Sequence, residues 1–180
     1  TLEPSSAASD VYKRQILSLQ QSSNNDNISA AVISRKTGGW WRQIILNKGS
    51  KDGVEIGNIV TGPGGLLGRV KNTSLFTSSV TLLTSPESKL GVWVDRSQTN
   101  GVLVGSGDDH PSLILYSKEA DIKVGDFVSS SPASSLLPPN IPIGIVQSID
   151  ETSQSKKTAK ISLLAKPHLI DWVQILKVNI

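Results

Sequence analysis

Few residues of this chain could do chemistry, and the most reactive of them gather in one polar turn. His110 follows Asp108 and Asp109, and with a serine they could form a triad in which the imidazole activates the hydroxyl and a carboxylate orients the imidazole. Such catalysis also needs oxyanion donors, usually in a glycine-framed turn, and the sequence has no Gly-Asp-Ser-Gly-like segment. We therefore interpret this set as a turn between strands and predict no catalytic residue.

Groups that could hold a metal ion or a phosphate are also scarce. The chain has 2 histidines and no cysteine, so a metal site would need carboxylates at a spacing that the sequence does not show. His168, between Pro167 and an apolar run, is interpreted as a surface or strand-end residue. The segment Gly62–Gly65 lacks the Lys-Ser/Thr pair and the following helix of a phosphate-binding loop, so we predict a tight hairpin there. No metal and no cofactor is expected.

Two neighbouring indoles offer a possible binding platform. Trp40 and Trp41 could stack on sugar rings or nucleic-acid bases. Adjacent residues of a strand point to opposite faces, however, so we favour one ring in a core and the other over a barrel seam.

Composition indicates a folded, mildly basic protein. The formal net charge is +3, and the basic residues occur in runs of no more than two, whereas a nucleic-acid binder usually concentrates its charge in a stripe. A nucleic-acid-binding β-barrel remains an alternative, supported by Ile122–Val128 and the basic pI, and it predicts a clustered basic face. A degenerate chymotrypsin-like hydrolase is another, and it predicts a serine hydroxyl within hydrogen-bond reach of His110.

Short β-strands would have to position all of these residues. From Ile28 onward, short apolar runs alternate with turn residues at a spacing typical of barrels or sandwiches. Helical turns are expected only near Lys118–Ala120 and Pro167–Ile170. The predicted strands are Ile28–Arg35, Arg42–Asn47, Val54–Thr61, Leu66–Lys71, Ser79–Thr84, Leu90–Asp95, Asn100–Val104, Ser112–Tyr116, Phe127–Ser130, Ile143–Asp150, Thr158–Ala165 and Trp172–Val178.

The sequence contains one β-rich unit twice. Three segments recur in the same order with slowly growing offsets: Val54–Val60 as Ile122–Val128, Gly68–Val70 as Gly144–Val146, and Val80–Pro86 as Ile161–Pro167. The first has the pattern V-x-x-G-[ND]-x-V, in which glycine permits a sharp bend and the next side chain can hydrogen-bond the local backbone. Neither copy carries a set of catalytic groups, which indicates a binding or scaffolding module.

The predicted fold is all-β, with two small related six-stranded β-barrels packed together and a short N-terminal helical remnant. We expect the first barrel over residues 28–98 and the second over 99–180, although the last strand could pack with the first barrel. Residues 1–27 are expected to be a linker that holds the end of an upstream helix at Ile16–Gln21. Residues 1–15 resemble translated adaptor sequence and are treated as foreign.

Eight segments follow one another in an order that is more specific than the repeat alone: Ala31–Arg35, Trp40-Trp41, Ile45–Val54, Gly65–Val70, Thr84–Val92, Gly101–Gly105, Lys118–Asp126 and Pro138–Gly144. On these segments the chain resembles the bacterial rod shape-determining protein MreC family over about Ile28–Ile180. One departure is the loop 131–137, where serine and proline replace the family's glycine-rich segment, so we do not carry over that loop's shape.

This resemblance implies a non-enzymatic scaffold of the cell-wall elongation complex. Members have one membrane helix, a dimerising coiled coil and two barrels on the extracytoplasmic (periplasmic) side of the inner membrane, so Ile16–Gln21 would be a coiled-coil remnant. The implied partners are a class B penicillin-binding transpeptidase, other elongation proteins and further copies of the chain in dimers or filaments. Nucleic acid is not among them.

Apolar residues in expected loops are the candidates for partner contact. Leu75 and Phe76 lie in one such loop, and Leu136 and Leu137 precede a Pro-Pro step in another. If they are exposed together they mark an interaction surface. The alternative is that they close the end of a barrel.

Overall fold

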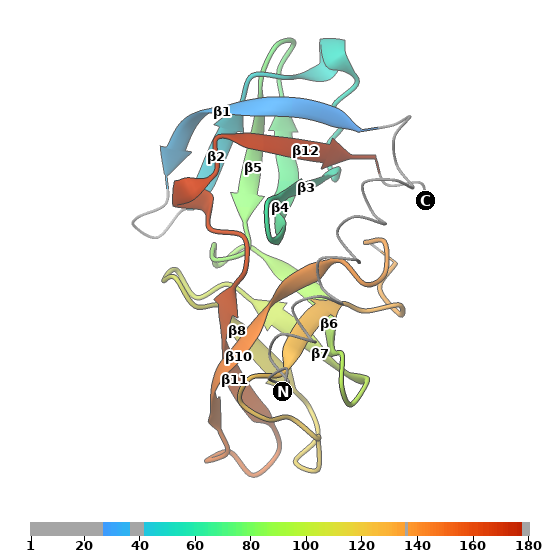
Figure 1. Cartoon of the computed structure of the whole chain (residues 1–180), viewed down its shortest axis with the longest axis vertical. Coiled ribbons are helices and arrows are strands. Elements are labelled where there is room, and N and C mark those ends of the chain that lie inside the picture. The colour runs from blue at the N-terminus through green and yellow to red at the C-terminus, as the bar shows by residue number, and fades with distance from the viewer. Residues whose placement is uncertain (1–26, 37–41, 136, 178–180) are drawn as a thin grey trace, which may run out of the picture.

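The computed structural model describes residues 27–36, 42–135 and 137–177, which form two barrels stacked along the long axis (Figure 1). The predictions for residues 1–26, Trp40, Trp41 and Leu136 fall outside these residues. Two short 3-10 turns, η1 (Ser50–Asp52) and η2 (Pro167–Leu169), accompany the strands. The strands are β1 (Ile28–Lys36), β2 (Gln43–Leu46), β3 (Ile59–Gly62), β4 (Gly65–Thr73), β5 (Ser78–Leu82), β6 (Lys89–Val94), β7 (Thr99–Val104), β8 (Ser112–Leu115), β9 (Phe127–Ser130), β10 (Pro142–Asp150), β11 (Lys157–Leu163) and β12 (Trp172–Leu176).

Each barrel is a closed antiparallel sheet. The strand order is β1-β12-β3-β4-β5-β2 in the first barrel and β10-β11-β8-β7-β6-β9 in the second. Each predicted strand overlaps an observed one, so the all-β fold of two six-stranded barrels is confirmed. Closure leaves neither sheet with an unpaired edge.

The first five residues of the repeated V-x-x-G-[ND]-x-V segment, Val54–Asn58, form a turn, so the strand expected over Val54–Thr61 begins only at Ile59 as β3. Gly57 has φ +92°, a left-handed conformation that glycine adopts without a Cβ penalty. Its N–H donates to the carbonyl of Val70 at 2.9 Å. The buried Asn58 side chain accepts the Glu55 N–H at 2.9 Å, which fixes the bend.

The second copy builds the same turn before β9. Gly125 has φ +93°, and its N–H donates to the carbonyl of Val146 at 2.9 Å. The buried Asp126 carboxylate accepts the Lys123 N–H at 2.8 Å. Even the bulge that follows Val70 in β4 recurs after Val146 in β10. The two halves therefore share backbone geometry as well as sequence.

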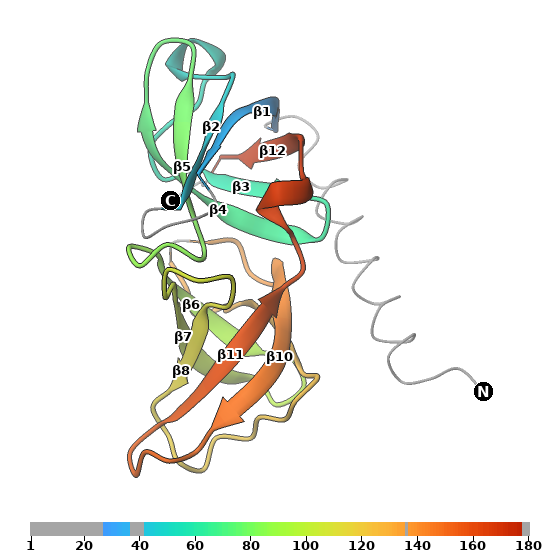
Figure 2. The same ribbon diagram turned by 90° about the vertical axis from the view of Figure 1, so that its left-hand side faces the viewer.

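The two copies exchange their final strands. By pairing order, β1 to β5 correspond to β7 to β11, and β6 corresponds to β12. Yet β6 lies in the second barrel between β7 and β9, while β12 lies in the first between β1 and β3. The expected range 28–98 for the first barrel is therefore wrong in including β6, which belongs to the second barrel, whereas the alternative that the last strand packs with the first barrel is the arrangement observed for β12. Two crossovers, 83–88 and 164–171, carry the chain between the barrels (Figure 2).

Alternating apolar residues fill both barrels, and one core continues across the junction. Ile59 and Leu66 of the first barrel pack in the same cluster as Leu103 and Ile143 of the second, together with Leu83 of the first crossover. Burying one such side chain stabilises the fold by about 1.5–3 kcal/mol. The shared cluster is the reason that the barrels pack as one body.

A chain that ends at Ile170, and so lacks β12, should lose the first barrel selectively. Without β12, β1 and β3 have no common neighbour, and their backbone groups become open edges. In hydrogen-exchange mass spectrometry we expect β1 and β3 to lose protection while β8 and β11 keep theirs. Equal loss in both barrels would contradict the strand exchange as the element that closes the first barrel.

Candidate partner-binding surface

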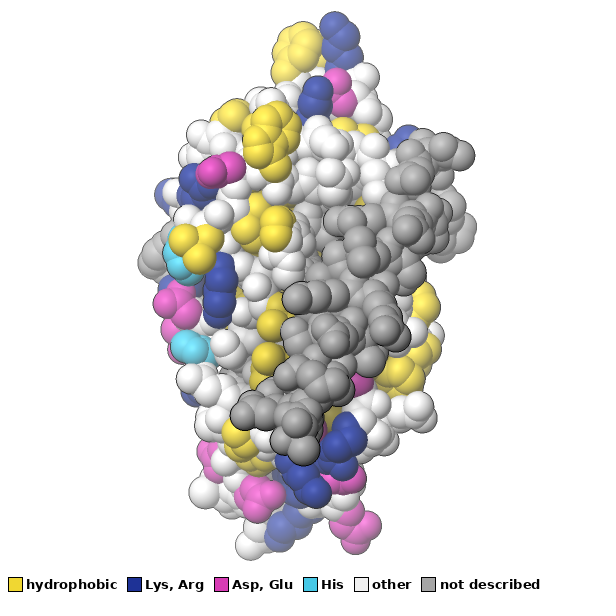
Figure 3. All heavy atoms as spheres, viewed as in Figure 1, with side chains coloured by type: hydrophobic (Ala, Val, Ile, Leu, Met, Phe, Trp, Pro, Cys, Tyr) yellow, Lys and Arg dark blue, Asp and Glu magenta, His cyan; other side chains and the backbone are white. Residues whose placement is uncertain are grey.

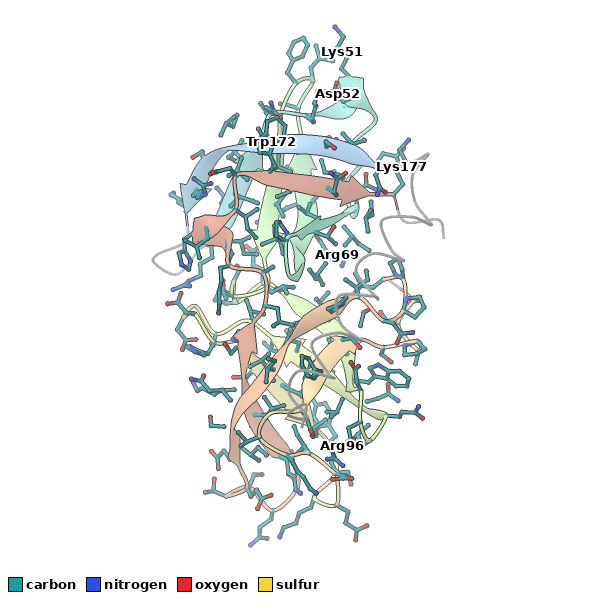
Figure 4. The ribbon with its side chains drawn as sticks, in the orientation of Figure 1. Lys51, Asp52, Arg69, Arg96, Trp172 and Lys177 are labelled. Atoms are coloured by element: carbon teal, nitrogen blue, oxygen red, sulfur yellow. The ribbon has the colours of Figure 1, made fainter. Side chains whose placement is uncertain are left out.

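The first-barrel tip, defined as Gly49–Asp52 together with Ser74–Thr77, presents two of the expected contact residues. Leu75 and Phe76 lie in the loop between β4 and β5, and each is 57% exposed. Figure 4 shows Lys51 and Asp52 at the end of the first barrel that is farther from the second. The tip is thus the apolar end of an elongated molecule, accessible to a partner.

Backbone contacts hold this tip in one shape. The N–H groups of Ser50 and Lys51 donate to the carbonyls of Ser74 and Leu75 at 2.8 and 3.1 Å. A Cβ at Gly49 would collide with the carbonyl of Ser74, so only glycine allows the two segments to approach this closely. A surface preordered in this way loses less conformational entropy when a partner binds.

A cation lies over the aromatic ring of the tip. The Lys51 ammonium is 5.2 Å from the centroid of the Phe76 ring, within the range of a cation–π contact. Figure 3 shows a basic and an apolar side chain side by side at this end. The tip therefore combines apolar area with positive charge.

The matching hairpin of the second barrel has a different character. Residues 151–156 connect β10 and β11 as Glu-Thr-Ser-Gln-Ser-Lys, and none of them is apolar. Because the two copies share one backbone plan, the apolar residues of the first tip are not a requirement of the fold. Their exposure instead points to an interaction surface.

The other expected contact site is not a surface. Leu137 is only 4% exposed and packs in the core of the second barrel, so it closes the barrel, as the alternative had it. The loop around it is fixed by Ser130, whose hydroxyl donates to the carbonyl of Pro138 at 2.6 Å and accepts the N–H of Ile141 at 2.8 Å. Leu137 thus contributes stability, and Leu136 lies outside the described residues.

The residues of the possible triad form a polar turn. The Ser106 hydroxyl donates to Asp108 Oδ1 at 2.8 Å, and the backbone N–H of His110 donates to the same oxygen at 2.9 Å. These bonds, first that from His110, lower the pKa of the Asp108 carboxyl. Within the described ranges, no hydrogen bond joins the His110 imidazole to a serine hydroxyl, so the hydrolase alternative lacks its defining contact.

The structure brings both histidines to one cavity, which the sequence did not indicate. His110 and the exposed His168 line a hollow of about 270 Å³ at the junction of the barrels, together with Arg42 and Asp109. The hydrogen bond from Arg42 at 2.7 Å lowers the pKa of the Asp109 carboxyl, and both histidines add to that shift. In the part of the chain that the structure describes, no group of three or more histidines and carboxylates is arranged to hold a metal ion.

Arg96, a basic residue that contacts Ile122–Val128, the segment behind the nucleic-acid alternative, is paired with carboxylates. Arg96 makes two hydrogen bonds each to the carboxylates of Asp121 and Asp126, at 2.8–3.0 Å. Basic and acidic side chains are also interspersed on the face seen in Figure 3. A clustered basic stripe, which nucleic-acid binding requires, is not present on that face.

Trp172 is an exposed aromatic that the sequence analysis did not identify as a candidate contact. Trp172 is 64% exposed on β12, where it pairs with Ala31 of β1, and it lies on the outer face of the first barrel (Figure 4). Side chains alternate between the two faces of β12, so Trp172 must point outward when Val173 and Ile175 are buried. This alternation in the sequence could have identified Trp172 as exposed. It forms a second candidate contact on the same barrel.

Substitutions at the two apolar loops should affect stability to very different extents. Phe76→Asp changes an exposed ring, so we expect the free energy of unfolding to change by about 1 kcal/mol or less. Leu137→Asp buries an unpaired carboxylate and should cost more than about 4 kcal/mol. Urea denaturation of both variants measures the difference. Similar losses would show that the tip is a structural element.

Acid lability should depend on Arg96. Its hydrogen bonds lower the pKa of Asp121, so this carboxylate stabilises the fold above its unfolded pKa of about 3.9, and the contribution disappears as the pH falls through the lower folded value. The melting temperature of Arg96→Gln should therefore fall less steeply between pH 5 and pH 2.5 than that of the unchanged chain. Lys118→Gln removes the same charge from an exposed position and should keep the original slope.

Comparison with known proteins places this architecture in one family. The family model for the barrel core of rod shape-determining protein MreC matches residues 32–177. The cell shape-determining protein MreC of Caulobacter vibrioides is 32% identical over 149 residues, which cover 82% of this chain and 41% of that protein. This chain thus spans less than half of that relative's length.

Solved structures agree with this placement. The crystal structure of MreC from Pseudomonas aeruginosa has a TM-score of 0.79 at 26% identity, covering 85% of this chain and 100% of that one. A complex between penicillin-binding protein PBP2 and MreC from Helicobacter pylori contains the same fold, with a TM-score of 0.65 at 16% identity over 84% of this chain and 98% of that one. The chain therefore belongs to the rod shape-determining protein MreC family.

Proposed function

We propose that this chain is the barrel region of a non-catalytic scaffold that determines cell shape by organising peptidoglycan synthesis. Its work is positional: rigid barrels hold partner proteins of the wall-elongation complex at fixed places. Membership of the MreC family, whose relatives are named as cell shape-determining proteins, carries this proposal. The hydrogen-bonded turns and shared core supply the rigidity that such a role needs.

A class B penicillin-binding transpeptidase is the proposed partner. The Helicobacter pylori relative forms a complex with penicillin-binding protein PBP2, which supports a partner of this type for the present chain. The first-barrel tip is the proposed contact, because Leu75 and Phe76 are exposed, preordered and absent from the matching hairpin. A few anchor side chains, aromatic ones among them, usually supply most of the binding energy of an interface.

Extracytoplasmic location, a membrane anchor upstream and self-association into dimers or filaments belong to the same proposal. In the described part of the chain, no helix is long and apolar enough to cross a membrane. An anchor would therefore lie outside these residues. The exposed Trp172 on the first barrel is the proposed contact for further copies.

Pulldown from a membrane extract tests the scaffold role. The immobilised chain should retain the class B transpeptidase, and Phe76→Asp should reduce the retained amount about tenfold or more, as expected for loss of an interface anchor. Tyr116→Asp is the matched control, because Tyr116 is an exposed aromatic of the second barrel outside the tip. Detection is by mass spectrometry or by labelling with a fluorescent penicillin.

Two results would contradict this proposal in different ways. Retention of no wall-synthesis protein by the unchanged chain would remove the scaffold role. Equal retention by Phe76→Asp and the unchanged chain would leave the role intact but exclude the tip as the docking site.

A further inference from the structure

A second surface of the first barrel contains a cation that has no partner among the described residues. Arg69 of β4 lines a cavity of about 340 Å³ where the first barrel meets the start of β6, together with Ile56, Lys71, Glu87 and Lys89. Figure 4 shows Arg69 toward the end of the first barrel that faces the second. This cavity is separate from the first-barrel tip and from the cavity of the two histidines.

The guanidinium of Arg69 makes no hydrogen bond or ion pair with the part of the chain that the structure describes. Its Nε is buried and has no hydrogen-bond partner, and within residues 27–36, 42–135 and 137–177 no ion pair includes Arg69. Such orphaned donors are rare in folded proteins because they lose water without gaining a protein partner. An arginine kept in this state needs a reason other than stability.

The duplication shows that the fold does not demand a cation here. Arg69 pairs with Ile59 and Thr81 in the first barrel, and Ile145 takes the same place in the second, opposite Phe127 and Ser162. Similarly, Gln147 stands where the first copy has Lys71. The same turn, bulge and strand pairing therefore form around an uncharged residue.

Charge and shape of the cavity indicate what it would bind. Among the described residues that line it, Glu87 is the only one with a carboxylate, and Lys71 occupies it: the Lys71 Nζ lies 3.0 and 2.8 Å from its two oxygens. This leaves Arg69 and Lys89 as excess positive charge. At the rim, Ile56 is 68% exposed and provides apolar area beside the cations. A carboxylate next to an apolar side chain fits both features, since guanidinium groups bind carboxylates through paired hydrogen bonds.

We propose that this cavity is a docking site for an acidic peptide segment of a protein partner, with Arg69 as the residue that receives a glutamate or aspartate side chain. Lys89 adds long-range attraction, and Ile56 packs against the apolar neighbour of that acidic residue. The Lys71–Glu87 ion pair links β4 to the first crossover and forms one wall of the cavity. This site does not depend on which protein supplies the segment, so it is independent of the transpeptidase proposal.

Nuclear magnetic resonance of the ¹⁵N-labelled chain tests the site directly. The probes are acetyl-Leu-Glu-Leu-amide and its glutamine counterpart, and the readout is the side-chain Nε–Hε resonance of Arg69, assigned from its loss in Arg69→Ile. We expect a saturable shift with the glutamate peptide and none with the glutamine peptide. Arg69→Ile should bind the glutamate peptide at least about tenfold more weakly, as followed by backbone amides around Gly57. Lys156→Gln, which removes an exposed cation from the second barrel, should bind it normally.

The same experiment distinguishes a loss of binding from a loss of folding, and an acidic peptide from other anionic ligands. Arg69→Ile should keep the original amide spectrum, and its melting temperature should be unchanged or higher, because Ile145 shows that the fold accepts isoleucine at this place. Arg69→Gln serves as the second variant. The proposal is overturned if the two peptides bind equally, if neither shifts Arg69, or if Arg69→Ile binds as well as the unchanged chain. It is also overturned if Arg69 responds only to inorganic phosphate or only to phosphatidylglycerol vesicles.

Discussion

Closure of each sheet by a strand from the other sequence copy is the constraint on which the rest of the structure depends. With β12 between β1 and β3, and β6 between β7 and β9, every strand has two neighbours and neither barrel has an edge to protect. The two crossovers that this exchange requires bring the barrels into contact, and the shared core around Ile59 and Leu66 forms there. The two barrels, and the surfaces at their far ends, are therefore held at fixed positions relative to one another.

Duplication also separates what the fold needs from what it does not. Features that both copies share, such as Gly57 and Gly125 in their left-handed turns, have a geometric cause. A feature found in only one copy is not required by this shared geometry. Phe76 at an exposed tip and Arg69, whose buried Nε has no partner among the described residues, are of the second kind, and both lie in the first barrel. Function is therefore expected to concentrate there, while the second barrel supplies support.

Much of the fold could be predicted from the sequence, because strand patterns and turn residues are local signals. The repeat revealed two barrels, and Gly62–Gly65 revealed a hairpin, since β3 and β4 do meet at Pro63-Gly64. Exchange of the final strands could not be read in this way, because β6 and β12 look alike as strands and only pairing over long distances decides their barrel. Burial of Leu137 and exposure of Phe76 depend in the same way on packing, so the sequence leaves both outcomes open for each loop.

Strand exchange also has a consequence for the order in which the protein folds as it is synthesised. Strands β6 to β11 are contiguous in the chain, so the second barrel can close as soon as β11 is available. The first barrel must wait for β12, which joins β1 across a separation as long as the 145 residues between Ser29 and Gln174. Until then β1 and β3 expose open edges, the condition in which chains pair with one another by mistake. The half that carries the candidate binding surfaces is thus the half that matures last.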